Sequence, residues 1–445
     1  NKCYHRVGIQ ASNKIFINFG ICLMSKLRNT EYSLADYRAP NSEILFTLEH
    51  VADVDRLGNW NGQLAKEILL HASKFVEEVI APAEPDLDTQ LPIFENGRVK
   101  VAPALVQIAK QFSDDGWFGL SVPVQEGGQG QPVVLTNVIF EMIAGASLNT
   151  SMALLTPTSA LKLILAEAST EQKSRYITGL LSGEYNATIV LSEPQAGSDL
   201  RLIRAMARPT EDGNWLIEGE KVFCSNADHD MSQNILHCVI ARTEGAPDGV
   251  KGLSLFLCPA VLPDGSRNDI SISRVEQKMG LHASPTCQMN FDGAVAEMVG
   301  AEGEGLHRMF TMMNAMRVDV AVQGVGLCQI ALQRSMAYAA DRKQGRGISI
   351  DHASPEPLTI NKHGDIRRML LTMDALTKGC RAMVYRTAIE LELDQQSKLG
   401  ELLIPVCKVF ASDAANEVAD MAIQIHGGYG YIGVYQIEQI ARDDR

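Results

Sequence analysis

The sequence contains no Cys-x-x-Cys pair, although nine cysteines are spread along its 445 residues. An odd number without clustered spacing predicts neither a zinc site nor a disulfide framework. Basic residues are in the minority, 40 against 53 acidic ones, and no Lys/Arg cluster occurs. This composition argues against a nucleic-acid-binding protein. We expect a reducing compartment, the cytoplasm in a bacterium or the mitochondrial matrix in a eukaryote.

No apolar run is long enough to cross a bilayer, so the sequence predicts no membrane span. Residues 14–23 are mildly apolar and follow basic residues, but Asn18 interrupts them and no small-residue cleavage site follows. The first methionine is Met24. We therefore expect translation to begin there and residues 1–23 to be upstream readthrough, with a cleaved leader as the alternative.

Three zones of apolar periodicity follow an N-terminal arm at 1–41. Residues 42–186 are mostly of helical spacing, and Pro82 and Pro85 are expected to stop one helix. Residues 187–300 switch to short β runs, and helical spacing returns over 301–445. The expected β runs are 215–217, 235–241, 253–257 and 270–275, and the expected long helices are 305–342, 361–395 and 401–426. The sequence thus predicts an α+β multidomain protein with an N-terminal helical domain, a middle β-barrel-like domain and a C-terminal helical bundle.

Two segments of the middle zone carry the strongest signal for a binding site. Residues 192–199 read Ser-Glu-Pro-Gln-Ala-Gly-Ser-Asp and follow an apolar run, which predicts a strand that opens into a binding loop. Residues 219–226 read Gly-Glu-Lys-Val-Phe-Cys-Ser-Asn. On an extended strand, Phe223 and Ser225 would lie on the same side. A planar ligand would fit between the two segments.

These segments resemble the flavin-binding segments of the acyl-CoA dehydrogenase family, which carry a Thr/Ser-Glu-Pro-x-Ala-Gly-Ser-Asp loop and a Lys-x-Trp/Phe-Ile-Thr/Ser-Asn strand at this separation. The helical, β and helical order of the zones resembles the family fold from about residue 40 onward. Residues 37–40, 228–230 and 252–256 are similar to the 3-methylmercaptopropionyl-CoA dehydrogenase-like branch.

The resemblance implies FAD as the cofactor. It places Leu191 and Ser192 against the flavin, with the Ser192 hydroxyl at the pyrimidine edge, where donors stabilise the reduced ring. It also places Phe223 over one ring face and Ser225 near N5. Taken without the resemblance, Phe223 reads as an inward-facing core residue of a β domain.

The resemblance also implies contacts to the acyl-CoA substrate. Ser198 matches a position near the CoA moiety and the cofactor, although it also suits a turn cap together with Asp199. Asn314 and Arg317 match the start of the substrate-side helix, which Arg317 is expected to open. The alternative for Arg317 is a paired or snorkelling side chain on an apolar helix.

A second set of residues implies a flavin site shared between subunits. Arg342 resembles the arginine that reaches the FAD pyrophosphate of a neighbouring subunit, although Gly345 stands where the family commonly has Phe. Gln424, Gly427 and Gly428 resemble the Gln-x-x-Gly-Gly loop, whose glycines let the backbone approach the cofactor. The implied assembly is a homodimer or homotetramer.

Two further patterns suggest a dinucleotide site and a metal site, but their sequence context fits neither. Residues 428–433 satisfy Gly-x-Gly-x-x-Gly, but they follow a helical run, and a dinucleotide fingerprint follows a strand. We interpret these glycines as a helix C-cap that serves the flavin loop. His229 lies between two aspartates, but no second ligand set has metal-site spacing, so we predict no metal.

The reaction implied by the resemblance is FAD-dependent α,β-dehydrogenation of an acyl-CoA in fatty-acid β-oxidation, with electrons passing to an electron-transfer flavoprotein. The family's catalytic glutamate is expected beyond Arg445, and Met316 occupies the position where some relatives carry it instead. No catalytic residue is therefore assigned, and we expect the 445 residues alone to be inactive. The alternatives are an acyl-CoA oxidase, or a flavin-binding relative without a base that acts as a binding or scaffold protein.

Overall fold

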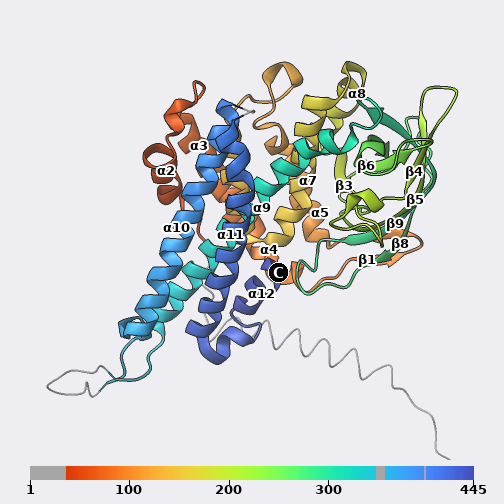
Figure 1. The fold of residues 1–445 in the computed structure, drawn as a ribbon. Coiled ribbons are helices and arrows are strands. Elements are labelled where there is room, and N and C mark those ends of the chain that lie inside the picture. The colour runs from red at the N-terminus through yellow and green to blue at the C-terminus, as the bar shows by residue number, and fades with distance from the viewer. Residues whose placement is uncertain (1–36, 347–355, 395–396) are drawn as a thin grey trace, which may run out of the picture.

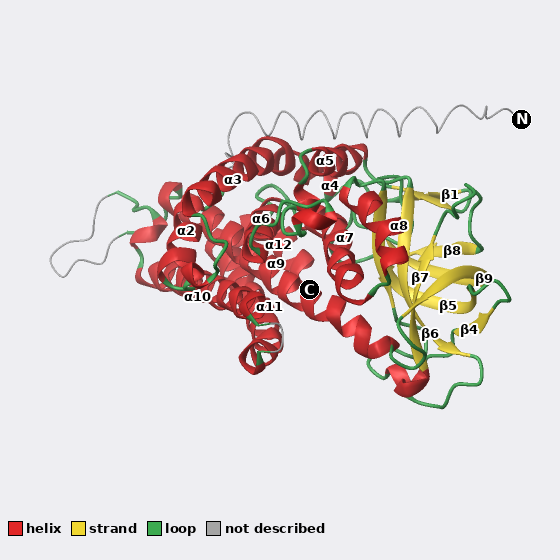
Figure 2. Ribbon diagram, turned by 90° about the horizontal axis from the view of Figure 1, so that it is seen from above, coloured by secondary structure: helices red, strands yellow, loops and turns green. Residues whose placement is uncertain are grey.

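The computed structural model describes residues 37–346, 356–394 and 397–445. The expectations about Met24, a leader and most of the N-terminal arm lie outside these residues. Within them, helices precede and follow a set of strands (Figures 1 and 2). The predicted fold class is confirmed.

The helices before the strands are α2 (Asn41–His50), α3 (Gly62–Phe75), α4 (Ala81–Leu87), α5 (Pro103–Asp114), α6 (Val133–Ala146), α7 (Leu148–Glu167) and α8 (Thr170–Leu181), with a short hairpin of β1 (Ile93–Glu95) and β2 (Arg98–Lys100) between α4 and α5. The helices after the strands are α9 (Gly305–Asp341), α10 (Gly364–Leu393), α11 (Lys398–His426) and α12 (Ile437–Asp444).

Pro82 and Pro85 do not stop the helical path, contrary to the prediction. A π-helical turn (Val76–Ile80) joins α3 to α4, and Pro82 lies in the first turn of α4. Proline is tolerated there because the first turn of a helix has no partner for its N–H groups. Pro82 thus marks the start of a new helical segment, whereas Pro85 lies inside α4, which continues to Leu87.

The strands of the middle part form a seven-stranded sheet that closes on itself. Its members are β3 (Tyr185–Val190), β4 (Met206–Pro209), β5 (Trp215–Ser225), β6 (Asn234–Thr243), β7 (Leu253–Pro259), β8 (Ile270–Val275) and β9 (Thr286–Val299). The order β3-β6-β4-β5-β9-β7 is closed by an additional pairing of β6 with β7, while β8 pairs with β9. This closure confirms the expected barrel-like form, and β3 extends it by pairing in parallel with β6.

Helix α9 connects the barrel to the body of helices. Its first residue, Gly305, lies so close to β7 that a Cβ there would come within 2.2 Å of the Ser254 carbonyl carbon. From this point α9 runs for 37 residues to the far end of the helical part (Figure 1). It is long and apolar enough to cross a membrane, but 78% of its apolar window is buried in the protein, as in a core helix.

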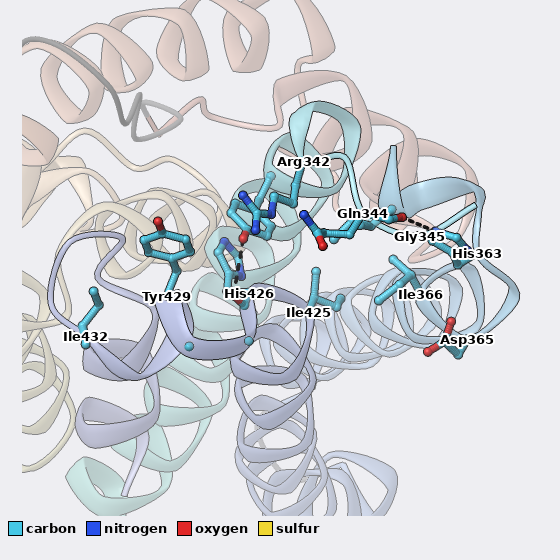
Figure 3. A pocket seen from close by; sticks show the side chains of 14 residues that line it. Arg342, Gln344, Gly345, His363, Asp365, Ile366, Ile425, His426, Tyr429 and Ile432 are labelled. Carbon is cyan, nitrogen blue, oxygen red and sulfur yellow. Dashed lines mark hydrogen bonds between the residues drawn. The ribbon is translucent and has the colours of Figure 1, made fainter. Parts of the chain in front are cut away.

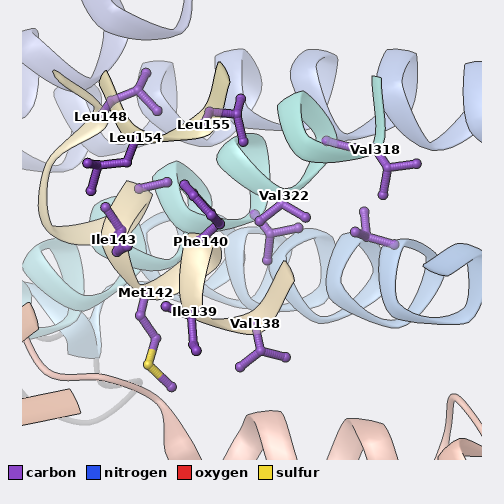
Figure 4. Close-up of a cluster of buried hydrophobic side chains, with 14 of the residues drawn as sticks. Val138, Ile139, Phe140, Met142, Ile143, Leu148, Leu154, Leu155, Val318 and Val322 are labelled. Atoms are coloured by element: carbon purple, nitrogen blue, oxygen red, sulfur yellow. The ribbon is translucent and has the colours of Figure 1, made fainter. Parts of the chain in front are cut away.

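The helical core forms where α6 and α7 pack against α9. Val138, Phe140 and Leu154 meet Val318 and Val322 there, all of them buried (Figure 4). The approach of α6 to α9 is close because the contact uses glycines. A Cβ on Gly326 would lie 2.7 Å from the Glu141 carbonyl oxygen.

A buried polar network ties α10 to this core. Arg381 donates to Glu141 Oε1 from Nε at 2.9 Å and from Nη2 at 2.7 Å, and the Tyr385 hydroxyl donates to Glu141 Oε2 at 2.6 Å. Arg381 also donates to Gln329 Oε1 on α9. The Arg381 and Glu141 side chains are each 1% exposed, so this ion pair is shielded from solvent and neither charge can lose its partner without a large cost.

Candidate active site

The first predicted segment forms a loop at the end of β3. Its turn is closed by hydrogen bonds between Glu193 N and Ala196 O at 3.0 Å and between Ala196 N and Glu193 O at 2.9 Å. Asp199 ends the loop by accepting from the Arg201 backbone N–H, which caps a short 3-10 turn. The sequence prediction of a strand that opens into a loop is therefore confirmed.

The second predicted segment is not a regular strand. Lys221 of β5 pairs with Met289 and Cys224 pairs with Cys287, so two residues of β5 face one residue of β9. Phe223 lies in this bulge with φ of 58°, a left-handed conformation that non-glycine residues rarely adopt. The prediction that Phe223 and Ser225 share one side of an extended strand is wrong in its geometry, because the bulge rotates the backbone between them.

The bulge turns the Phe223 ring out of the barrel. Phe223 is 69% exposed, which overturns the interpretation of this residue as part of the core. Strained backbone that exposes an aromatic ring is characteristic of binding sites, where the surrounding structure holds the conformation. The ring is therefore available to a planar ligand, as the resemblance implies.

The two segments lie side by side and carry three serine hydroxyls. Val222 N donates to Ser192 O at 2.9 Å, which joins the bulge to the start of the loop. Ser192 and Ser225 are half-buried and Ser198 is exposed. Within the part of the chain that the structure describes, none of their hydroxyls has a hydrogen-bond partner. These three groups can donate to a bound ligand.

Asn226 is a supporting residue that the sequence argument passed over. Its Nδ2 donates to Met152 O on α7 at 2.9 Å, and its backbone N–H donates to Pro285 O at 2.7 Å. Like Phe223, it has a positive φ, at 56°. Its place at the end of the motif was the available signal, since asparagine tolerates the left-handed conformation better than most residues.

The second predicted set of residues meets in a different pocket of about 620 Å³ (Figure 3). Arg342, Gly427 and Gly428 line it, together with Tyr338 and Tyr429, which the sequence argument did not single out. The Arg342 guanidinium lies 6.0 Å from the centre of the Tyr429 ring. A cation, two aromatic rings and exposed backbone suit the phosphate and base portions of a nucleotide.

The glycines and Gln424 near this pocket differ in their positions. Gly427 caps α11 with φ of 60°, so the glycine run is a helix end as predicted, not a dinucleotide fingerprint. Gln424 is exposed on the last turn of α11 but does not line the pocket. Gly345 does line it, with φ of 67°.

Arg317 does not open a helix, contrary to the prediction. Helix α9 begins twelve residues earlier at Gly305, because the apolar residues before Arg317 continue the helical spacing. Arg317 Nη1 donates to Asn314 Oδ1 at 2.7 Å, and its guanidinium lies 5.5 Å from the centre of the Phe310 ring. The structure thus brings Asn314 and Arg317 together, and the alternative interpretation of a locally paired arginine describes this geometry.

The Asp-His-Asp segment fastens the β1–β2 hairpin to the barrel. Asp228 accepts from Arg98 Nε at 3.0 Å and from Val99 N at 2.7 Å, and Asp230 accepts from Val101 N at 3.0 Å. His229 is buried and accepts from Met231 N. Among the described residues, no group of three potential ligands could hold a metal ion.

Because two histidines are buried, we expect the protein to lose stability markedly in acid. Burial lowers the pKa of both His229 and His237 to about 3, so both imidazoles are neutral in the folded protein. Their contribution to the free energy of unfolding is fully present above pH 6.5, the ordinary pKa of histidine, and is lost as the pH falls below this value. Each histidine then costs about 1.4 kcal/mol per pH unit. Urea unfolding at pH 7 and pH 4.5 measures this, and His237→Gln should reduce the difference. An equal difference in the variant would contradict the assignment.

Comparison with known proteins identifies the family to which this chain belongs. Models of the N-terminal, middle and C-terminal domains of acyl-CoA dehydrogenases match residues 64–184, 188–294 and 303–445. The 3-methylmercaptopropionyl-CoA dehydrogenase of Ruegeria pomeroyi is 37% identical over 92% of this chain and 73% of its own length. The chain belongs to the acyl-CoA dehydrogenase family.

Two other comparisons agree with this assignment. A broad-specificity linear acyl-CoA dehydrogenase of Mycobacterium tuberculosis is 29% identical over 92% of this chain and 72% of its own length. A solved structure reported for an electron transferring flavoprotein of Acidaminococcus fermentans matches 86% of this chain and 91% of its own, with a TM-score of 0.72 and 25% identity.

As a member of the acyl-CoA dehydrogenase family, the protein is an oxidoreductase with FAD as its cofactor. The residues present fit that group. Free hydroxyl donors suit the polar edge of a flavin, the exposed Phe223 ring suits its face, and the Arg342 pocket suits its pyrophosphate. FAD supplies the acceptor for the two electrons that leave the acyl-CoA.

Proposed function

We propose that the flavin ring of FAD lies between the 192–199 loop and the Phe223 bulge, and that the reduced flavin passes electrons to an electron-transfer flavoprotein. The observation that carries this proposal is the contact of Val222 N with Ser192 O, which joins the two segments, while the hydroxyls of Ser192 and Ser225 have no hydrogen-bond partner among the residues that the structure describes. Hydroxyl donors stabilise negative charge on a reduced flavin. The similar structure reported for an electron transferring flavoprotein supports the choice of acceptor.

The substrate is an acyl-CoA thioester whose CoA portion approaches Ser198. This serine is exposed near the end of the loop that begins at Ser192. A ligand that extends along the loop can therefore contact both serines. Asn314 and Arg317 form a polar pair on the otherwise apolar face of α9, and they are the candidate contacts from that helix. None of these residues is a carboxylate, so the base that removes the α-proton lies outside this set.

The two halves of the flavin site serve different copies of the chain. Helix α9 begins against the barrel, and Arg342 directly follows its other end, 37 residues away. At 1.5 Å per residue this is roughly 55 Å. The Arg342 pocket therefore belongs to the end of the molecule farthest from the barrel (Figure 1). A second copy of the chain that presents its own Arg342 completes each site.

An exposed apolar face on α10 and α11 supports assembly into a dimer or tetramer. Leu402 is 62% exposed and Val409 is 55% exposed, and both lie on α11. A groove beside them is lined by Leu376 of α10 and by Phe410 of α11. Adjacent exposed apolar side chains of this size are typical of surfaces that another protein covers.

Ser225→Ala tests the assignment of the flavin ring to this site. We expect the variant to fold, to bind FAD more weakly and to shift the visible flavin spectrum and the midpoint potential, because one donor to the ring is lost. Titration of the apoprotein with FAD and anaerobic reductive titration measure these changes. Ser174→Ala, on the exposed surface of α8, is the matched control and should match the wild type. An unchanged spectrum and potential in Ser225→Ala would contradict the placement.

A further inference from the structure

We propose that Lys221 and Glu193 are positioning residues for the flavin site: their buried ion pair fixes the 192–199 loop against the Phe223 bulge. Neither side chain is placed to touch the cofactor. The inference rests on the proposed function, because it concerns the same two segments. It differs from that proposal in assigning a role to the contact between the segments.

Lys221 is fully used as a donor inside the protein. Its side chain is 0% exposed, and Nζ donates to Leu191 O at 3.0 Å, to Glu193 Oε1 at 2.8 Å and to Ile240 O at 2.8 Å. An ammonium group has three protons, and each has one acceptor here. Lys221 therefore connects three strands or strand ends: the exit of β3, its own β5 and the neighbouring β6.

Glu193 is satisfied just as completely. Besides Lys221, Oε1 accepts from Ala205 N at 3.0 Å, while Oε2 accepts from Arg204 N at 2.7 Å and from Gln195 Nε2 at 2.6 Å. Burial opposes the charge of this carboxylate, but Lys221 and the backbone donors outweigh it and lower the pKa of Glu193. Glu193 is therefore ionised at neutral pH. Burial lowers the pKa of the Lys221 ammonium, and the Glu193 carboxylate opposes this shift.

The positions of these contacts in the chain suggest their purpose. Leu191, whose carbonyl Lys221 holds, directly precedes Ser192, and Glu193 directly follows it. Lys221 itself directly precedes the Val222–Phe223 bulge. Leu191, Ser192 and Phe223 thus lie within two positions of Lys221 or Glu193, and Ser225 lies four positions beyond Lys221 on the same strand.

Stability alone does not account for this arrangement. Replacing a buried ion pair with apolar residues of similar volume is often neutral or stabilising, because both charges must lose their hydration. What apolar residues do not supply is direction: three hydrogen bonds from one ammonium fix the loop and the bulge in one register. Binding groups held by such a supporting layer keep the geometry that the ligand needs.

The test separates folding from positioning through the double variant Lys221→Met/Glu193→Leu. We expect it to fold with a lowered urea midpoint, because buried backbone groups such as Ile240 O and Ala205 N lose their partners. Its FAD dissociation constant should rise by at least about tenfold, which corresponds to about 1.4 kcal/mol, and the visible circular dichroism of the bound flavin should decrease. The matched control is Arg381→Met/Glu141→Leu, which removes another fully buried ion pair, in the helical body. Its flavin affinity and dichroism should stay within twofold of the wild type.

A second variant keeps the proposal testable if the double variant does not fold. Glu193→Asp retains both charges but shortens the carboxylate arm by one methylene. We expect it to fold and to show a weaker flavin dichroism and a raised FAD dissociation constant. If the double variant or Glu193→Asp binds FAD with wild-type affinity and dichroism, the positioning role is wrong. If Ser225→Ala also leaves the flavin unchanged, the proposed site itself is wrong.

Discussion

Replacing Arg342 with alanine is expected to weaken FAD binding and subunit assembly together. Arg342 lines the second pocket, and hydrogen bonds from an arginine to a charged group each contribute about 1.5–3 kcal/mol. Their loss corresponds to roughly a tenfold to hundredfold rise in the dissociation constant. A ligand that bridges two subunits couples its own binding to their association. Calorimetric FAD titration and sedimentation velocity, with and without FAD, measure both effects.

The neighbouring lysine provides the control for this experiment. Lys343 is exposed next to Arg342 but does not line the pocket. Lys343→Ala removes the same formal charge and should leave FAD affinity and assembly as in the wild type. A stable monomer that binds one FAD fully and is insensitive to Arg342→Ala would refute the shared site.

Breaking the buried pair of Arg381 and Glu141 is expected to cause the largest loss of stability. Glu141→Gln leaves the guanidinium of Arg381 buried without a counter-charge, between α6, α9 and α10. Removing one partner of a buried ion pair typically costs about 3–5 kcal/mol. Urea unfolding followed by far-ultraviolet circular dichroism measures the change in the free energy of unfolding.

An exposed ion pair gives the comparison for Glu141→Gln. Lys110 and Asp114 pair on the surface of α5, where their side chains are 72% and 61% exposed. Asp114→Asn should change the free energy of unfolding by less than about 1 kcal/mol. Equal effects of the two variants would show that burial does not control the strength of the Arg381 pair.

The sequence predicted the parts of the fold that depend on repeating patterns. The three long helices were expected at 305–342, 361–395 and 401–426 and occur at nearly the same bounds, because apolar periodicity over some thirty residues is a strong signal. Strand β9, although the longest, was not expected. Asp292 and Gly293 interrupt its sequence, and its alternating burial follows in part from pairing with β5 and β7, which are distant in the chain.

The candidate site shows the same division between local pattern and distant contact. The loop of Ser192 and the cap at Gly427 follow from local turn chemistry, so their sequences were sufficient. The left-handed conformation of Phe223 was not predictable, because it arises from the mismatch in residue number between β5 and β9. The ion pair of Lys221 and Glu193 joins residues 28 positions apart and requires the folded barrel.

The central claim is that the flavin ring lies between the 192–199 loop and the Phe223 bulge. A crystal structure of the chain with FAD tests it most directly. We expect the flavin ring in contact with the Phe223 side chain, with the hydroxyls of Ser192 and Ser225 within hydrogen-bond distance of its polar edge. A flavin bound elsewhere, with these hydroxyls and the Phe223 ring still facing solvent, would contradict the account.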